Sequence, residues 1–306
     1  MTDPATLSAP PTTSTAPAAA LAAAPTPAAP TTPSVFWSAP EGRVRLFHGD
    51  SLAVLGSLPA ESVDVIFADP PYFLSNGGMT CRSGKRSSVD KGAWDQSRGV
   101  EANHEFNRAW LRACQRVLRP NGTIWVSGTG HVIYSVGYAM QQLGFKPLNE
   151  IVWEKPNPPP NLSCRYFTHA TESILWAARD RKSKHHFAYD AMRKINGGTQ
   201  MKTVWRMTAP GKSEKLHGRH PTQKPLGLLE RILLASCGPE GVVLDPFNGS
   251  GTTGVAAARL GHRYIGVDLD REYLELTRRR LLADRPEWER AAPATPAAKP
   301  ALHLVA

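Results

Sequence analysis

Four consecutive residues, Asp69, Pro70, Pro71 and Tyr72, place a carboxylate and an aromatic ring on a backbone with little freedom to bend. They follow an apolar run at 65–68 that is typical of a buried strand. Two adjacent prolines fix φ at both positions and remove two backbone donors. The carbonyls of Asp69 and Pro70 are therefore poorly placed for a regular ladder or helix. We expect this strand end to bind a flat group that carries N–H donors.

A second segment, VVLDPFNGSGTTG at 242–254, reads as a strand, a tight turn and a helix. Gly249, Gly251 and Gly254 form the GxGxxG pattern in the context that nucleotide-binding turns require. Asp268 ends the next predicted strand, where a carboxylate can bind ribose hydroxyls. NAD fits these features. A phosphate-binding P-loop fits them less well, because no lysine follows the glycines.

Asp245, just before the glycines, favours a different cofactor. A carboxylate aimed into the site would repel a pyrophosphate, whereas it would attract the ammonium group of an amino acid. S-adenosylmethionine carries an ammonium, a ribose and an adenine, and it has no phosphate. Phe247 can pack on its adenosyl part, the backbone at 249–252, including Thr252, can approach it closely, and Asp268 can bind its ribose. The alternative for Asp245 is a role confined to forming the turn.

With that cofactor, Asp69 and Tyr72 suit methyl transfer to an exocyclic amine of adenine or cytosine. Such an amine is a poor nucleophile, because its lone pair is delocalised into the ring. Hydrogen bonds from the amine to Asp69 and the Pro70 carbonyl would draw the nitrogen toward sp³ and aim the lone pair at the sulfonium methyl. Tyr72 would stack on the base, which must be flipped out of the helix. The structural alternatives are a capped Pro-Pro turn and an ordinary core tyrosine.

These motifs lie in a chain that alternates predicted strands and helices. Strands are predicted at 43–50, 63–69, 122–128, 149–155, 172–180, 241–247 and 263–270, and helices at 51–58, 103–118, 132–143, 224–237, 252–261 and 272–283. The alternation predicts an α/β fold with a doubly wound, mostly parallel sheet at 35–290. Residues 1–34 and 291–306, which are rich in Ala and Pro, are predicted to be disordered because they offer little apolar surface to bury.

Two segments interrupt this alternation. Residues 73–102 are too long for an ordinary connection and rich in Ser, Gly and Lys, which predicts a mobile binding loop. Residues 181–218 are basic, with interleaved aromatic and histidine side chains; solvated charge is the usual meaning, but the pattern favours a target-recognition region that contacts nucleic acid. The predicted DNA-binding residues are Lys85, Arg86, Lys91, Trp94, Arg165, Lys202, Trp205 and Arg206.

Composition narrows the class of protein. The 306-residue chain is 41% hydrophobic with a formal net charge of +10, and segments 1–34 and 291–306 hold one charge each. A basic folded region favours polyanionic partners, although solubility alone is the alternative. The four cysteines are far apart without a CxxC pair, which fits a reduced cytoplasmic protein and offers no zinc site. The N-terminus lacks the charged start of a signal peptide, and no apolar run approaches the roughly 18 residues of a spanning helix.

Residues 43–283 resemble the amino-methylating DNA methyltransferases in the β-type order. In that order DPPY comes first, a target-recognition region follows, and the cofactor glycines come last. The resemblance implies that DNA is the substrate and that Thr222, Lys224 and Pro225 of HPTQKPLGLLERIL lie against the methionine part of S-adenosylmethionine. It also implies that Asp50 and Ser51 of HGDSL meet the cofactor adenine. Because β-type relatives are often dimers, a homodimer is expected.

Further stretches are similar to the DpnA-type adenine methylases of restriction-modification systems: DPPYFLSNGG, SVDKGAWD, NPPPNLSCRYFTHATESILWA and the segment at 219–225, where Arg219 replaces a lysine. Those enzymes act on GATC and tolerate single-stranded DNA. The similarity implies transfer to the N6 amine of adenine, since cytosine-N4 enzymes more often carry serine in place of Asp69. The alternatives are N4-cytosine transfer and a non-catalytic DNA-binding protein on the same fold. Methylation of RNA or of a protein glutamine fits less well. The enzymes that catalyse those reactions are recognised by an NPPY motif placed after the glycines, whereas here DPPY comes before them.

Overall fold

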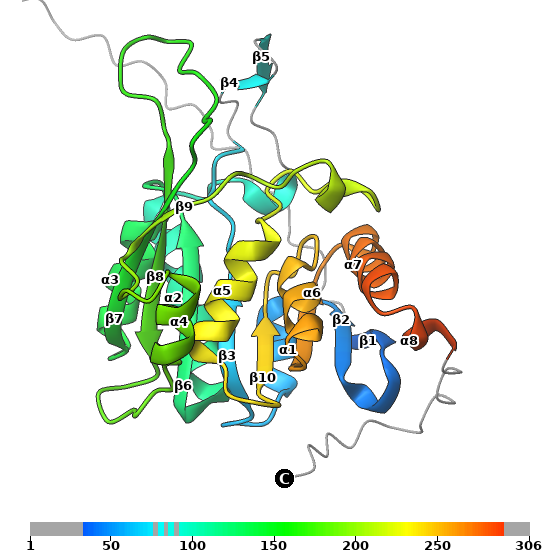
Figure 1. Ribbon diagram of the computed structural model, residues 1–306. Helices are drawn as coiled ribbons and strands as arrows, with labels where there is room; N and C mark the ends of the chain where they lie inside the picture. Colours follow the sequence, from blue (N-terminus) through cyan, green and yellow to red (C-terminus); the bar gives the residue numbers. More distant parts are fainter. Residues whose placement is uncertain (1–32, 76–78, 83–84, 89–91, 291–306) are drawn as a thin grey trace, which may run out of the picture. The chain divides into compact units, whose positions relative to one another are not determined.

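The computed structural model describes residues 33–75, 79–82, 85–88 and 92–290. Within these ranges a nine-stranded sheet has the order β1-β2-β11-β10-β3-β6-β8-β7-β9, and β4 and β5 form a separate two-stranded sheet (Figure 1). The strands are β1 (Ser34–Ser38), β2 (Val44–His48), β3 (Val63–Ala68), β4 (Met79–Arg82), β5 (Lys85–Ser88), β6 (Leu118–Gly128), β7 (Lys146–Glu154), β8 (Thr171–Ala178), β9 (Val204–Arg206), β10 (Val242–Asp245) and β11 (Arg263–Asp268).

The centre of the large sheet is parallel. Neighbouring strands from β2 through β11, β10 and β3 to β6 all run in the same direction. Strand β8 runs antiparallel to both β6 and β7, and β1 runs antiparallel to β2. Strand β9 is parallel to β7. The prediction of a mostly parallel sheet is therefore confirmed, and the carboxyl ends of its central strands meet at one edge.

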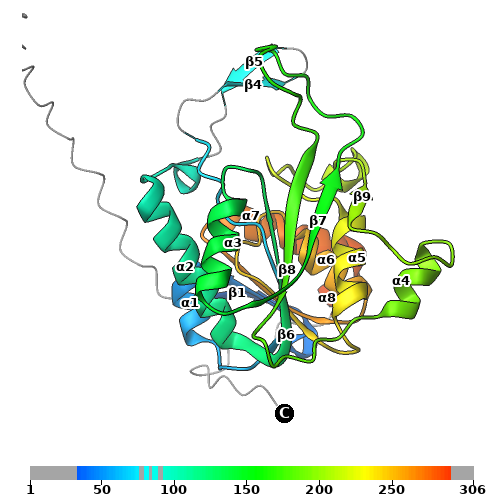
Figure 2. The ribbon, with the colours of Figure 1, turned by 90° about the vertical axis from the view of Figure 1, so that its left-hand side faces the viewer.

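Helices cover both faces of this sheet (Figure 2). One face packs against α1 (Ser51–Ser57), α2 (Val100–Val117) and α3 (Ile133–Gln142). The other packs against α5 (Leu226–Ser236), α6 (Thr252–Arg259) and α7 (Arg271–Asp284). The shorter elements are α4 (Tyr189–Ile195), α8 (Glu287–Arg290) and the 3₁₀ turns η1 (Pro40–Gly42), η2 (Ala93–Asp95) and η3 (Ser213–Lys215).

Strand β3 shows why the sequence requires both helical layers. Its side chains alternate between the two faces, so Ile66 and Ala68 join the core under α1–α3, while Val65 and Phe67 join the core under α5–α7. A strand that is buried on both faces reads as a continuous apolar run. The carboxylate of Asp69 follows such a run, which places it at the sheet edge.

Strand β1 was not predicted. It includes Ser34, the last residue of the predicted tail, and pairs with β2, while Trp37 lies 6.4 Å from the Trp288 ring. Residues 1–32 and 291–306, on which the disorder prediction rests, lie outside the described residues. Strand β6 also begins earlier than predicted, at Leu118, and α2 begins at Val100.

The two interrupting segments contain regular structure. Within 73–102, the described residues include β4, β5, η2 and the first residues of α2. The basic segment 181–218 supplies α4, β9 and η3, and β9 extends the large sheet beside β7. In the described part of the chain, no helix is both long enough and apolar enough to cross a membrane.

Candidate active site

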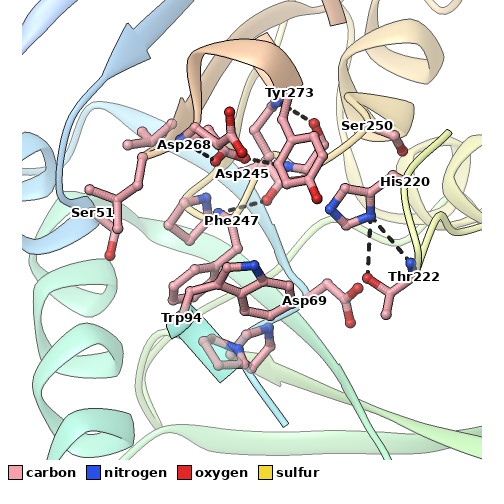
Figure 3. A pocket seen from close by; sticks show the side chains of 18 of the residues that line it. Ser51, Asp69, Trp94, His220, Thr222, Asp245, Phe247, Ser250, Asp268 and Tyr273 are labelled. Atoms are coloured by element: carbon pink, nitrogen blue, oxygen red, sulfur yellow. Dashed lines mark hydrogen bonds between the residues drawn. The ribbon is translucent and has the colours of Figure 1, made fainter. Parts of the chain in front are cut away.

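Four adjacent parallel strands end in predicted acidic residues. Asp69 follows β3, Asp245 ends β10, Asp268 ends β11, and Asp50 lies just after β2. Because these strands are parallel neighbours, their ends line one pocket (Figure 3). Doubly wound α/β proteins bind their ligands in this position, outside the carboxyl ends of the strands.

The turn between β10 and α6 depends on glycine. Gly249 and Gly251 have φ of 50° and 71°, in the left-handed region that glycine adopts without strain. A Cβ on Gly251 would lie 2.3 Å from the Thr277 side chain, and one on Gly249 would lie 3.1 Å from His220. The backbone of the turn is therefore held close to its neighbours, and Gly249 can lie on the pocket wall.

Asp245 is buried beneath this turn. One carboxylate oxygen accepts from the Phe247 N–H at 3.0 Å, and the other accepts from the Thr253 hydroxyl at 2.6 Å. Burial raises the pKa of Asp245 to about 7, although these two hydrogen bonds oppose the rise. Asp245 thus forms the turn, as the structural alternative proposed, and it also lines the pocket. A cationic ligand would stabilise the ionised form of this buried carboxyl.

Asp268 has a similar environment. Its two oxygens accept from the backbone N–H groups of Gly249, at 2.7 Å, and Asp270, at 2.9 Å. Burial raises the pKa of Asp268 to about 7 against the effect of these hydrogen bonds. The buried carboxyl of Asp245 and the half-buried carboxyl of Asp268 line the same pocket and suit a ligand that carries an ammonium group and hydroxyls. This donor set fits S-adenosylmethionine and would disfavour a pyrophosphate.

Asp69 lies in a dense polar network. Its Oδ1 accepts from the Tyr72 hydroxyl at 2.7 Å and from the Ser127 hydroxyl at 2.5 Å. Its Oδ2 accepts from Lys224 Nζ at 2.5 Å. Burial, together with the carboxylates of Asp69 and Glu172, raises the pKa of Tyr72 well above its usual value. The Tyr72 hydroxyl therefore keeps its proton and acts as a donor to Asp69.

Glu172, near the start of β8, extends this network. Its carboxylate pairs with Lys155, lies 3.6 Å from Lys224 Nζ and accepts from the Tyr72 hydroxyl at 3.3 Å. Burial acts to raise the pKa of Glu172, but the two ammonium groups hold it below its usual value. Burial likewise acts to lower the pKa of Lys224, but Asp69 and Glu172 hold it above its usual value. Lys224 is therefore a buried cation shared between two carboxylates.

Asp95 fixes the backbone that follows Asp69-Pro70-Pro71. Its Oδ1 accepts from the N–H groups of Tyr72 and Phe73, each at 2.8 Å. Its Oδ2 accepts from the Leu74 N–H at 3.2 Å and the Ser75 hydroxyl at 2.9 Å. Phe73 has φ of 58°, which is uncommon for a residue with a side chain. One fully buried carboxylate thus closes a strained turn next to the predicted catalytic motif.

Comparison with known proteins identifies this arrangement. A profile of a DNA methylase family, the N6 and N4 methyltransferases, matches residues 63–279. The chain belongs to this family of DNA methylases. The Type II methyltransferase M2.DpnII of Streptococcus pneumoniae is 56% identical to the methylase over 245 residues, which cover 80% of this chain and 91% of the relative. M2.LlaDCHI of Lactococcus lactis subsp. cremoris is 57% identical over 237 residues, covering 77% and 88%.

A solved structure supports the same assignment. The crystal structure of the M1.HpyAVI complex with S-adenosylmethionine matches the methylase with a TM-score of 0.59 and 27% identity, covering 78% of this chain and 98% of that one. The protein is a site-specific DNA methyltransferase, and its cofactor is S-adenosylmethionine. The prediction of a DNA methyltransferase is confirmed by the Type II relatives, in preference to a non-catalytic DNA-binding protein.

Most residues predicted to hold the cofactor lie together in the methylase pocket, as do Pro70, Pro71 and Tyr72 of the predicted catalytic motif. The predicted cofactor residues on its wall are Asp50, Ser51, Asp69, Thr222, Lys224, Asp245, Phe247, Gly249, Thr252 and Asp268. Pro225 and Gly251 are not among the residues that line the pocket and lie instead at the N-caps of α5 and α6. Lys224, expected against the methionine part of the cofactor, has its ammonium on Asp69.

The predicted DNA-binding residues of the methylase are more dispersed. Trp94 lines the pocket and is 39% exposed, and the exposed side chains include Arg165, Lys202 and Arg206. Lys85 and Arg86 lie in β5, and Lys91 lies outside the described residues.

Trp205 requires a correction. The sequence placed it on the DNA surface, but its ring is 5% exposed and lies 6.3 Å from the Trp125 ring in the core. Its indole N–H donates to the Lys202 carbonyl at 2.9 Å. The ring is therefore part of the core under β9 and is not available to stack on a base.

Three partners of the predicted catalytic motif, Ser127, Glu172 and Asp95, were not predicted from the sequence. Ser127 occupies the end of β6 just as Asp69 follows β3, and this shared position at a strand end was a usable signal. Glu172 is a charged residue at the start of an apolar strand, which is a second signal. Asp95 gave no local signal, because its partners lie twenty or more residues away in the chain.

Proposed function

We propose that the protein methylates the N6 amine of adenine within the sequence GATC, in duplex DNA and also in single strands. The observation that carries this proposal is the position of Asp69, beside a pocket whose carboxyls, the buried Asp245 and the half-buried Asp268, suit S-adenosylmethionine. The DpnA-like stretches and the identity to M2.DpnII support the choice of target.

The cofactor supplies the methyl group when it is bound. Asp245 would face its ammonium group, Asp268 its ribose hydroxyls, and Asp50 with Ser51 its adenine. Phe247 would pack against the adenosyl part, supported by the Trp110 ring at 5.4 Å. These contacts orient the cofactor and leave the methyl-transfer end of the pocket to Asp69 and Tyr72.

Asp69 and the Pro70 carbonyl would accept the two hydrogens of the adenine amine. Because Asp69 is held by Tyr72 and Ser127, its acceptor atoms are in place before the base arrives, which is the condition for electrostatic preorganisation. The base would pack in the pocket near Tyr72 and Trp94, which both line it. After transfer, the extra proton on the amine must leave, and the neighbouring carboxylate of Asp69 is the nearest acceptor that we assign to the amine.

The amine would also share Asp69 Oδ2 with a donor that already binds there. Lys224 occupies Oδ2 at 2.5 Å, and Glu172 lies 3.6 Å from the same ammonium. We assign to Lys224 a short shift from Asp69 toward Glu172 when the target base enters. The buried cation would then keep a carboxylate partner throughout, which avoids the penalty of an unpaired buried charge.

The same proposal includes a DNA-binding surface and an oligomeric state. The folded domain at 35–290 would bind DNA through the region at 181–218 and the basic hairpin β4–β5, contacting phosphates with Lys202, Arg206 and Arg165. All three side chains are exposed to solvent, and Arg206 Nε lies 3.6 Å from the Glu154 carboxylate. We also propose a homodimer that works in the cytoplasm beside a restriction enzyme, and sedimentation analysis would test the oligomeric state.

Product analysis tests the proposal. Purified protein would be incubated with S-adenosylmethionine and one oligonucleotide, single-stranded or annealed, with GATC or with the same bases scrambled. Digestion and mass spectrometry should find N6-methyladenine in both GATC substrates and in neither scrambled one. N4-methylcytosine would contradict the adenine assignment, methylation of the scrambled site would contradict GATC, and methylation of duplex alone would contradict the single-strand claim.

A further inference from the structure

The connection between β7 and β8, residues 155–170, is an arm that rises from the edge of the sheet that carries the active site (Figures 1 and 2). At its base, the Lys155 N–H donates to the Ala170 carbonyl at 2.7 Å. Lys155 also pairs with Glu172, which contacts Tyr72. The arm therefore begins and ends at the catalytic network.

Local chemistry holds the tip of this arm in place. Four prolines restrict φ along the outgoing limb, and such segments behave as semi-rigid spacers; they are Pro156, Pro158, Pro159 and Pro160. At the tip, the Asn161 side chain donates to the Tyr166 carbonyl at 2.6 Å and accepts from the Ser163 N–H at 3.0 Å. A turn closed at both ends by one side chain presents the next residues in a defined direction.

Those next residues expose apolar surface beside a positive charge. Phe167 is 95% exposed, Tyr166 is 61% exposed and Leu162 is 43% exposed. Arg165, between them, is also exposed. A single exposed apolar side chain is ordinary, but three on one stiff projection mark a contact surface. The adjacent guanidinium favours a partner with phosphate groups.

We infer that this tip enters the DNA duplex beside the target and that Phe167 fills the gap left in the base stack when the adenine is flipped out. This inference rests on the proposed function, because a flipped base is its premise. Phe167 lies five residues before Glu172, so its Cα stays within about 18 Å of the Glu172 Cα. An aromatic ring can stack on any base, and apolar wedges between base steps are a known way of bending and opening a duplex.

Duplex and single-stranded DNA should depend differently on Phe167. In a duplex, flipping breaks pairing and stacking, and a ring in the vacated space offsets part of that penalty. A single strand has no paired stack to refill. Phe167 should therefore matter for duplex GATC and matter little for single-stranded GATC, whereas a residue that binds the base or the cofactor would matter for both.

The test compares Phe167→Ala and Phe167→Trp with Tyr134→Ala, which removes a 78% exposed aromatic side chain from α3. Because Phe167 is exposed, its variants are expected to melt within about 1 °C of the parent protein. Phe167→Ala should lower kcat/KM on duplex GATC by about ten-fold or more, consistent with the loss of one stacked ring. Its kcat/KM on single-stranded GATC should stay within about two-fold, and Phe167→Trp and Tyr134→Ala should act like the parent protein.

A second measurement separates this inference from the proposed function. A duplex with 2-aminopurine at the target adenine should brighten when the parent protein binds and brighten much less with Phe167→Ala. A mismatch opposite the target should restore the fluorescence increase with Phe167→Ala, because the base pair is already broken. Equal losses on both substrates, or no loss on duplex, would overturn the role of Phe167. Absence of N6-methyladenine with the parent protein would instead overturn the proposed function, while the fluorescence assay would still report on the arm.

Discussion

Lys224 Nζ lies 2.5 Å from Asp69 Oδ2, so the carboxylate assigned to the target amine is already hydrogen-bonded to a buried cation. The other oxygen of Asp69 is held by Tyr72 and Ser127. The adenine amine would therefore compete with Lys224 at Oδ2, and Lys224 has an alternative partner in Glu172, 3.6 Å from its ammonium. Access to Asp69 and the charge of Glu172 are coupled through one lysine.

This coupling predicts the effect of Glu172→Gln. Without its charge, position 172 offers Lys224 a poorer partner, so the lysine should remain on Asp69 and compete with the amine. We expect kcat to fall by about ten-fold or more, the scale of a lost charge-assisted contact, with the Kd for S-adenosylmethionine little changed. Glu150→Gln, an exposed carboxylate on β7 that contacts Ser173, is the matched control. A Glu172→Gln enzyme with the kcat of the control would rule out the shift of Lys224.

The raised pKa values of Asp245 and Asp268, each about 7, predict a pH-dependent cofactor affinity. A cationic ligand favours the charged carboxylate, so the affinity for S-adenosylmethionine should rise between about pH 6 and about pH 8. Asp245→Asn should weaken binding at the upper pH and reduce this slope. Titration calorimetry at several pH values provides the measurement, and an affinity that is flat with pH would contradict the ionic role.

The same pKa shifts determine how the stability of the ligand-free protein changes with pH. Folding raises both pKa values above the usual 3.8, so the folded state binds more protons between those values. The stability contributed by these protonated carboxyls is present below about pH 4 and is lost as the pH rises through about 7. Thermal melts of the parent protein and Asp245→Asn across this window should diverge as the pH rises, with the variant retaining more stability.

Asp95→Ala should damage both the fold and the reaction. The change removes the acceptor of three backbone N–H groups and one hydroxyl, and each buried donor left unsatisfied costs about 1–3 kcal/mol. We expect a lower melting temperature and a loss of turnover that exceeds the loss of cofactor affinity. Glu101→Ala, at an exposed position in the first turn of α2, is the control. Unchanged melting and turnover in Asp95→Ala would show that the turn is stable without this carboxylate.

Removing residues 1–32 should leave activity and melting temperature nearly unchanged, because their composition offers little apolar core. Removing residues 1–38 should lower the melting temperature, because the cut eliminates β1 and the Trp37 contact with Trp288. The two truncations, compared by thermal melting and methylation assay, bracket the start of the folded domain. Equal melting temperatures would mean that β1 contributes no stability.

Local patterns predicted the centre of the fold and the cofactor side of the site. The apolar run of β3, the glycine turn after β10 and the acidic strand ends around Asp245 and Asp268 are all encoded within a few residues. Chemistry that depends on distant pairing was not predictable in the same way. Asp95 meets its partners across a long connection, and Lys224 reaches Asp69 from 155 positions away.

Trp205 shows the opposite failure of local reasoning. In a basic stretch its aromatic ring read as a surface feature, but β9 pairs with β7 and turns that ring into the core. Strand β1 was missed because its five residues carry too short a pattern, and its identity depends on pairing with β2. Pairing between segments that are distant in the chain overrode the local signal in both cases.

The central claim is that Asp69 acts on the target amine, and single-turnover methylation by Asp69→Ala tests it most directly. The measurement uses duplex GATC with saturating S-adenosylmethionine, alongside calorimetric binding of the cofactor to the same variant. We predict a loss of more than about 10²-fold in the rate of N6-methyladenine formation, the scale of a lost transition-state contact, with cofactor affinity kept within a few-fold. Near-normal single-turnover methylation by Asp69→Ala would contradict the assigned role.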